Sequence, residues 1–226
     1  MNKRSVIENL LNLHHTTVAA IIRNLNPDQV RWLDFSIQNT ALDTVDLKDT
    51  PVFERWLSGE LQGKVGVGGF LENRAIYRRS AHFDGEGEEA RSIHLGVDIW
   101  IPAGTPVYAP WEARVHSFRD NEGFGNYGPT IILEHTIDHQ TFYTLYGHLS
   151  RSSLSNLKTG QPVAQNTLLG EVGPYPENGD WPPHLHFQVM TDLLGWVGDF
   201  PGVVVPSQQA DYAKICIDPR YLLRLY

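Results

Sequence analysis

From Ile93 onward, the chain consists of short runs of β-branched and aromatic residues that are separated by turn residues. This pattern is typical of antiparallel sheets. Twenty glycines and fourteen prolines, most of them beyond residue 50, argue against a helical bundle. The expected strands are Leu95–Ile101, Val107–Ala109, Ala113–Asp120, Thr130–Glu134, Gln140–Tyr146, Pro162–Val163, Leu168–Val172 and Leu185–Thr191. The sequence therefore predicts a mainly β protein with a compact antiparallel β core.

The first 65 residues have a different pattern and predict a helical accessory segment. Apolar residues recur there at irregular but helix-compatible intervals, and prolines stand where helices commonly begin. Three helices are expected, over Val6–Leu25, from Asn26-Pro27 through Ile37, and over Val52–Leu61 with Asp49 or Thr50 as its cap and Pro51 at its start.

The changes in composition divide the chain into four segments. Residues 1–65 are the helical segment, and residues 66–92 form a hinge and connecting loop, because Gly63–Gly69 is rich in glycine and Asp84–Glu89 is acidic. Residues 93–192 form the β domain, and residues 193–226 are expected to pack on this core as a C-terminal extension.

Charge and hydropathy exclude several classes of protein. The net charge is −8 and no run of Lys and Arg is long enough to make a basic stripe, so nucleic acid is not an expected partner. No segment is apolar over a membrane-spanning length. Polar residues interrupt the N-terminal stretch where a signal peptide would be apolar. The expected location is the cytoplasm, or the periplasm or exterior if a leader was removed or a non-classical export route is used. Nothing in the sequence indicates an oligomeric state.

The motif His94-Leu-Gly-Val-Asp98 places an imidazole and a carboxylate four residues apart. On a straight strand such residues lie about 13 Å apart, whereas both must approach one ion to about 2 Å. Gly96 permits a bend or bulge that brings the two side chains together. The motif is therefore compatible with a metal site only if the strand is interrupted at this glycine.

A second motif, Pro183-His184-Leu-His186-Phe, places two imidazoles on one face of a strand, about 6.6 Å apart along it. One can bind a metal while the other stands beside it. His148, in Tyr146-Gly-His-Leu, follows another expected strand and can accept a proton near neutral pH. Three nitrogen or oxygen ligands with a position left for water are typical of a catalytic zinc site, so the motifs together predict a metal-dependent hydrolase.

In this order along the chain, the motifs resemble those of the lysostaphin/LytM-type zinc metallopeptidases, which are peptidoglycan endopeptidases with a barrel-sandwich-like antiparallel β core. The resemblance covers about residues 93–190, under half of the chain. The matching elements are His94–Asp98, Ile101–Ala109, Gly125–Gly128, Thr130–His135, Tyr146–Leu149, Gly160 with Val163, Leu169–Gly170 and His184–Phe187.

The resemblance implies a role for each of five residues. His94, Asp98 and His186 are the implied ligands of one zinc ion. His148 and His184 are the implied catalytic pair, which activates water and stabilises the tetrahedral oxyanion. The implied partner is a peptide substrate derived from peptidoglycan.

Outside these five residues, the expected contacts with substrate come from two loops. Asn126 and Tyr127 lie in one matching element. Tyr175 and Trp181 lie in the proline-rich loop Gly173–Pro183, which replaces the small residues usual in the family, and they are equally compatible with packing this loop on the core. In latent relatives an upstream asparagine fills the fourth zinc position, and Asn73 is the candidate for that role here.

Two alternatives remain open at this stage. The same zinc chemistry can act on a cytoplasmic peptide or a small amide, an interpretation favoured by the altered rim loop and the absent signal peptide. A catalytically silent binding module of the same fold is the other alternative, although such modules typically lose ligands, and all five positions are present here.

Overall fold

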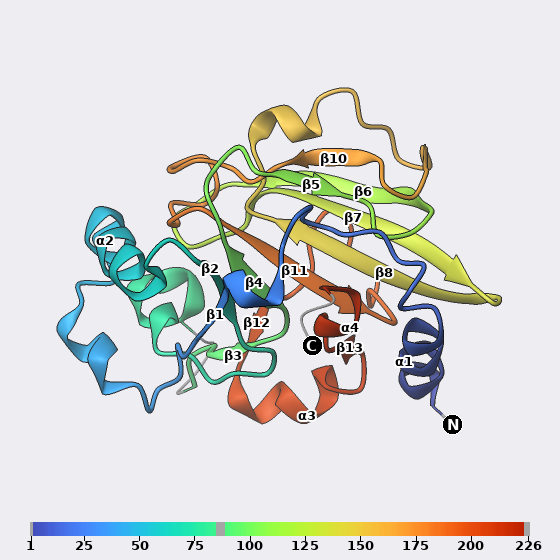
Figure 1. The fold of residues 1–226 in the computed structure, drawn as a ribbon. Helices are drawn as coiled ribbons and strands as arrows, with labels where there is room; N and C mark the ends of the chain where they lie inside the picture. The colour runs from blue at the N-terminus through green and yellow to red at the C-terminus, as the bar shows by residue number, and fades with distance from the viewer. Residues whose placement is uncertain (1, 85–88, 224–226) are drawn as a thin grey trace.

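The computed structural model describes residues 2–84 and 89–223. Residues 85–88 of the expected acidic loop and residues 224–226 of the C-terminal extension therefore lie outside the described residues. A large sheet with the strand order β1-β2-β4-β11-β8-β7-β6-β9 forms the centre of the molecule, and β13 pairs with β11 (Figure 1). Two small sheets pair β10 with β5 and β12 with β3. The mainly β fold predicted from the sequence is confirmed.

The strands are β1 (Val30–Leu33), β2 (Val65–Gly68), β3 (Ile93–His94), β4 (Val97–Trp100), β5 (Pro106–Tyr108), β6 (Ala113–Asn121), β7 (Gly128–Ile137), β8 (Gln140–Gly147), β9 (Pro162–Val163), β10 (Leu168–Glu171), β11 (His184–Met190), β12 (Val203–Val204) and β13 (Cys216–Ile217). The α-helices are α1 (Lys3–Leu13), α2 (Thr50–Leu61), α3 (Gln209–Tyr212) and α4 (Arg220–Leu223). Every strand expected beyond residue 93 has a counterpart, and β1 and β2 pair in parallel, so the sheet is mixed. Among the described residues, no helix is long and apolar enough to cross a membrane.

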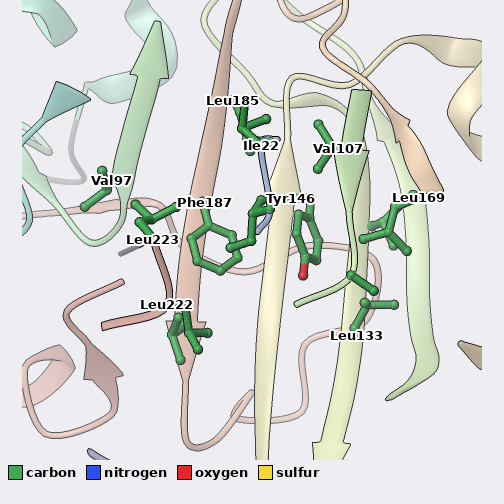
Figure 2. Packing of buried hydrophobic residues seen from close by; sticks show 14 of the residues in the cluster. Ile22, Val97, Val107, Leu133, Tyr146, Leu169, Leu185, Phe187, Leu222 and Leu223 are labelled. Carbon is green, nitrogen blue, oxygen red and sulfur yellow. The ribbon is translucent and has the colours of Figure 1, made fainter. Parts of the chain in front are cut away.

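The two faces of β4 and β11 carry different chemistry because side chains alternate along a strand. Antiparallel pairing places Phe187 opposite Val97 and Tyr146, and these side chains lie in the apolar core (Figure 2). The same register places His186 opposite Asp98 and His184 opposite Trp100. One face of this strand pair is therefore core, and the other face carries the chemistry.

The N-terminal segment departs from the prediction at Val30–Leu33, where the predicted helix is wrong. After a single 3₁₀ turn at Pro27–Gln29, these residues form β1, which pairs in parallel with β2. Valine, tryptophan and leucine are compatible with a strand, and pairing with β2 satisfies its backbone groups.

The predicted hinge is also wrong over Val65–Gly68, because these residues form β2, a strand of the central sheet that pairs with β4. A Cβ atom on Gly66 would lie 2.6 Å from Leu33 Cδ1, and a Cβ atom on Gly68 would lie 2.6 Å from Arg74 Nη2. The glycines allow close packing here. The expected segment boundaries remain predictions, but the N-terminal segment adds two strands to the sheet.

The helix predicted over Val6–Leu25 ends at Leu13. Beyond it the chain follows β5, where Tyr108 N–H donates to Ile21 O at 2.9 Å, and Val18 and Ile21 are buried in the core. The third predicted helix is confirmed as α2, whose start is capped by the Asp49 carboxylate accepting from Val52 N–H at 2.9 Å. Figure 1 shows α1 and α2 on opposite sides of the view, with α2 beside β1 and β2.

Candidate metal centre

The chain breaks its strand between His94 and Asp98, as the motif requires. β3 ends at His94, β4 begins at Val97, and Leu95 and Gly96 lie between them. A Cβ atom on Gly96 would lie 2.7 Å from Phe187 O and 2.8 Å from the His186 ring, so only glycine lets the segment between β3 and β4 approach β11 this closely. The expected interruption at Gly96 is therefore confirmed.

This break brings His94, Asp98 and His186 together in a buried cluster whose ligand atoms all lie within 4.8 Å of one another. His94 Nε2 lies 3.0 Å from His186 Nδ1 and 3.3 Å from Asp98 Oδ1, and Asp98 Oδ1 lies 3.0 Å from His186 Nδ1. None of the three residues is more than 3% exposed.

Neighbouring groups determine which nitrogen of each imidazole faces the centre of the cluster. His94 Nδ1–H donates to Gly69 O at 3.0 Å, which leaves the Nε2 lone pair free. His186 Nε2–H donates to Gln188 Oε1 at 3.1 Å, which leaves the Nδ1 lone pair free. Two lone pairs and one carboxylate oxygen thus converge without a proton between them, an arrangement that a cation stabilises.

His148 and His184 stand beside this cluster, with ring centroids 4.2 Å apart. His148 Nδ1–H donates to Asn178 O and His184 Nδ1–H donates to Pro182 O, both at 2.8 Å. Each ring therefore keeps its Nε2 atom as a free proton acceptor, and His184 Nε2 lies 3.9 Å from Asp98 Oδ1.

The surroundings favour the unprotonated forms of His94, Asp98, His148 and His184. Burial, reinforced by the charge of Arg74, lowers the pKa of His94 to about 4, and burial lowers the pKa of His184 to about 4. Burial and the neighbouring histidines hold the pKa of His148 well below its usual value. Burial opposes ionisation of Asp98, but His94 and Arg74 outweigh it and hold its pKa well below the usual range. Metal ligands must be unprotonated to bind.

A pocket of about 260 Å³ opens beside the cluster, and Asp98, His148, His184 and His186 all line it. Its walls are largely aromatic and include Trp181. A concave, mostly apolar pocket with a few convergent polar groups is the usual form of a small-molecule or peptide site.

Residues 92–195 match the sequence pattern of Peptidase family M23. This segment is an M23 peptidase domain. It contains all five residues of the cluster and its flanking pair, and it includes β3, β4 and β11, which carry four of them.

Two curated relatives match the same part of the chain. Peptidoglycan DD-endopeptidase ShyC of Vibrio cholerae serotype O1 is 31% identical over 99 residues, which are 44% of this chain and 20% of ShyC. L-Ala–D-Glu endopeptidase of Bacillus subtilis (strain 168) is 30% identical over 119 residues, 50% of this chain and 34% of that enzyme. The chain thus spans about a fifth of one relative and about a third of the other. Among solved structures, the catalytic domain of lysostaphin from Staphylococcus simulans aligns over 59% of this chain and 80% of its own, with 27% identity and a TM-score of 0.39.

Three of the four residues predicted to contact substrate line the pocket beside the cluster. Asn126, Tyr127 and Trp181 belong to its wall, and Tyr127 Oη lies 3.3 Å from His186 Nε2. Trp181 also packs its loop on the core, since it is only 3% exposed. Tyr175 is 49% exposed and is not part of the pocket wall.

The structure does not support the prediction that Asn73 fills a fourth ligand position. Asn73 forms an antiparallel bridge opposite Ile93, flanked by hydrogen bonds from His94 N to Glu72 O and from Arg74 N to Ser92 O. Bridged partners share one face of a ladder. Asn73 therefore lies on the face of Ile93, and the alternation places the His94 side chain on the opposite face.

Three residues that touch this centre were not predicted. Gln188 and Trp100 each lie two positions from a predicted ligand on the same strand, so strand alternation was a usable signal for both. The third is Arg74, whose guanidinium contacts Asp98 Oδ2. It precedes the M23 domain and belongs to none of the sequence motifs described above.

Proposed function

We propose that this chain is a zinc-dependent metalloendopeptidase that hydrolyses peptide bonds in peptidoglycan. The observation that carries the proposal is the convergence of His94 Nε2, Asp98 Oδ1 and His186 Nδ1 on one point beside a pocket, with His148 and His184 next to it. The match to M23 peptidases and the names of the two curated relatives support the choice of reaction and substrate.

The cluster fits a zinc ion in ligand type and in geometry. Two nitrogen ligands and one oxygen ligand with an open side are typical of catalytic zinc. Ligands that bind zinc tetrahedrally at about 2.0–2.1 Å lie about 3.3 Å from one another. The three separations in this cluster are 3.0, 3.0 and 3.3 Å, so an ion at their centre requires only small side-chain adjustments.

When bound, zinc supplies a Lewis acid that polarises a peptide carbonyl and makes water acidic enough to attack it near neutral pH. His148 serves as the general base in this proposal, because its Nδ1–H is held by Asn178 O and its Nε2 lone pair is free. After accepting a proton, the same imidazole can return it to the leaving amine.

His184 is suited to stabilise the developing oxyanion. Its ring is fixed by the hydrogen bond to Pro182 O and by stacking on Trp100, with ring centroids 4.0 Å apart. A fixed donor aimed at the position where negative charge develops lowers the barrier most effectively, because it needs no reorganisation during the reaction. Because its Nδ1–H is committed to Pro182 O, His184 would donate to the oxyanion from the doubly protonated imidazolium, which the developing negative charge would stabilise.

The proposal is tested by digesting purified peptidoglycan sacculi with the zinc-loaded protein and following the release of new amino groups. Mass spectrometry of the released peptides identifies the bond that is cut. We expect His148→Ala and His184→Ala to lower the rate about 100-fold or more. His15→Ala is the matched control, because His15 is exposed and lies next to α1, far from the site in sequence.

Intact sacculi after prolonged digestion would contradict the proposed substrate. Faster hydrolysis of unrelated peptides or small amides than of peptidoglycan peptides would favour the alternative substrate class. Binding of sacculi without hydrolysis by the zinc-loaded protein would favour the silent binding module.

A further inference from the structure

Residues 69–74 lie directly behind the metal ligands, although they precede the M23 domain at residues 92–195. The Gly69 carbonyl accepts from His94 Nδ1 at 3.0 Å, and the Arg74 guanidinium contacts Asp98 Oδ2. Two of the three proposed ligands are thus hydrogen-bonded to residues of this upstream stretch. Groups in such positions orient metal ligands and tune their affinity.

Arg74 is fixed more firmly than an ordinary surface arginine. It is 1% exposed, and its Nε–H donates to Glu72 Oε2 at 2.7 Å. Its Nη1 atom lies 3.3 Å from Tyr77 Oη as well as contacting Asp98, and its Nη2 atom lies 3.3 Å from Gly69 O. The planar fork of donors is therefore occupied on every side and cannot rotate.

Glu72 is held in turn by the backbone. Its Oε1 atom accepts from Phe35 N–H at 3.1 Å, so the carboxylate is tied to the N-terminal segment that also forms β1. With Glu72 and Asp98 each carrying one negative charge and Arg74 one positive charge, the set keeps a net charge of about −1 near the ligands. The arginine therefore orients Asp98 without removing the negative charge that attracts a cation.

The contact with Arg74 gives the two carboxylate oxygens of Asp98 different partners. Oδ2 is held by the guanidinium, and Oδ1 faces His94 Nε2 at 3.3 Å and His186 Nδ1 at 3.0 Å. A carboxylate free to turn can bind a metal through one oxygen or both. A carboxylate held at Oδ2 offers only Oδ1.

We infer that Arg74 is a positioning residue of the metal centre, which holds Asp98 so that a single oxygen is offered to the metal. This inference rests on the proposed function, because it presupposes a metal bound by Asp98. It also means that the upstream stretch is part of the centre. Arg74 is not part of the pocket wall, so a direct contact with substrate does not explain its burial.

The test measures metal binding in the whole chain, with the Arg74→Lys and Glu72→Gln variants beside the wild type. Zinc affinity is measured by competition with a chromophoric chelator, and coordination is followed by the visible absorption of the cobalt(II)-substituted protein. Lysine keeps the charge but lacks the fork. Arg78→Ala is the matched control, because Arg78 is exposed and belongs to the same 3₁₀ turn, Ile76–Arg79, that follows Arg74.

We expect Arg74→Lys to weaken zinc binding about 10- to 100-fold. We also expect the cobalt band to weaken as Asp98 turns to bind through both oxygens and the coordination number rises. Glu72→Gln removes the negative charge beside Arg74 but keeps a side-chain oxygen that can accept from Phe35 N–H. This variant should give a smaller change in the same direction. Arg78→Ala should match the wild type in both measurements.

Wild-type zinc affinity together with an unchanged cobalt spectrum in folded Arg74→Lys would overturn the inference. Tighter zinc binding by this variant would also overturn it, because Arg74 would then only repel the cation. If Arg74→Lys does not fold, the same two results in Glu72→Gln would overturn it. A wild-type protein that binds no zinc would instead overturn the proposed function and, with it, the role of Arg74.

Discussion

The indole of Trp100 lies almost parallel to the imidazole of His184, with ring centroids 4.0 Å apart and an interplanar angle of 21°. The two residues are direct partners in the ladder between β4 and β11. Phe35 and Phe53, from the N-terminal segment, pack against the same indole with ring centroids 5.3 and 5.7 Å away. The orientation of His184 thus depends on a cluster that extends beyond the M23 domain.

Replacing Trp100 with leucine should lower kcat about 10- to 100-fold, because a branched aliphatic side chain cannot hold the plane of the His184 ring. Zinc affinity should stay at the wild-type value, since Trp100 stacks on His184, which is not one of the three proposed ligands. Steady-state kinetics and chelator competition check the two expectations.

Trp56→Leu is the matched control for this prediction. Trp56 belongs to the same aromatic cluster through Phe35 and Phe53, with ring centroids 6.3 and 6.2 Å away. This variant should lose stability but keep kcat. An equal loss of kcat in both variants would show that the effect comes from general destabilisation.

The Gly96→Ala variant should bind zinc at least about tenfold more weakly than the wild type. The added methyl group would lie 2.8 Å from the His186 ring and 2.7 Å from Phe187 O, so the ligand ring or the strand must shift. Gly59→Ala is the control, because a Cβ atom there meets nothing within 4 Å, and alanine in α2 should stabilise the fold by about 0.5–1 kcal/mol. Unchanged zinc affinity in Gly96→Ala would contradict the proposed geometry.

The buried His135 should make the folded protein less stable in acid, independently of the proposed metal centre. It is fully buried, its Nδ1 lies 3.0 Å from Glu112 O, and its Nε2 lies 2.8 Å from Thr144 Oγ1. Burial lowers its pKa in the folded protein to about 4, below the ordinary value of 6.5 that applies in the unfolded chain. Because the unfolded state takes up the proton first, stability is constant above pH 6.5 and falls between pH 6.5 and pH 4.

For this one residue, the free energy of unfolding should decrease by about 2 kcal/mol between pH 7 and pH 5. Urea unfolding of the metal-free protein at the two pH values measures the decrease, and His135→Gln should reduce it by about that amount. His15→Ala, at an exposed position, should leave the pH difference unchanged. A His135→Gln variant with the full wild-type pH difference would show that His135 is not the group responsible.

The part of the site that lies on strands could be predicted because strand alternation is local. The spacing of His184 and His186 fixes a shared face in any strand, and Gly96 signals the break that His94 and Asp98 require. The same reasoning located the strands beyond residue 93, which the structure confirms. These features depend on neighbouring residues alone.

The N-terminal contribution could not be predicted in this way, because it depends on pairing between distant segments. Val30–Leu33 has apolar residues that suit a helix or a strand, and only its partner β2 decides between them. Likewise, Arg74 and Asn73 are adjacent in sequence, and the ladder opposite Ile93 determines which of them reaches the proposed metal ligands. The prediction chose Asn73, and the structure places Arg74 against Asp98.

The central claim is that side chains distant in sequence bind one zinc ion, and metal analysis of the purified chain tests it most directly. After equilibration with zinc and removal of the unbound ion, the account predicts one zinc per chain in the wild type and in His148→Ala. It predicts almost none in His94→Ala, Asp98→Ala or His186→Ala. A wild type without zinc, or a folded His94→Ala variant that retains a full equivalent, would contradict the claim.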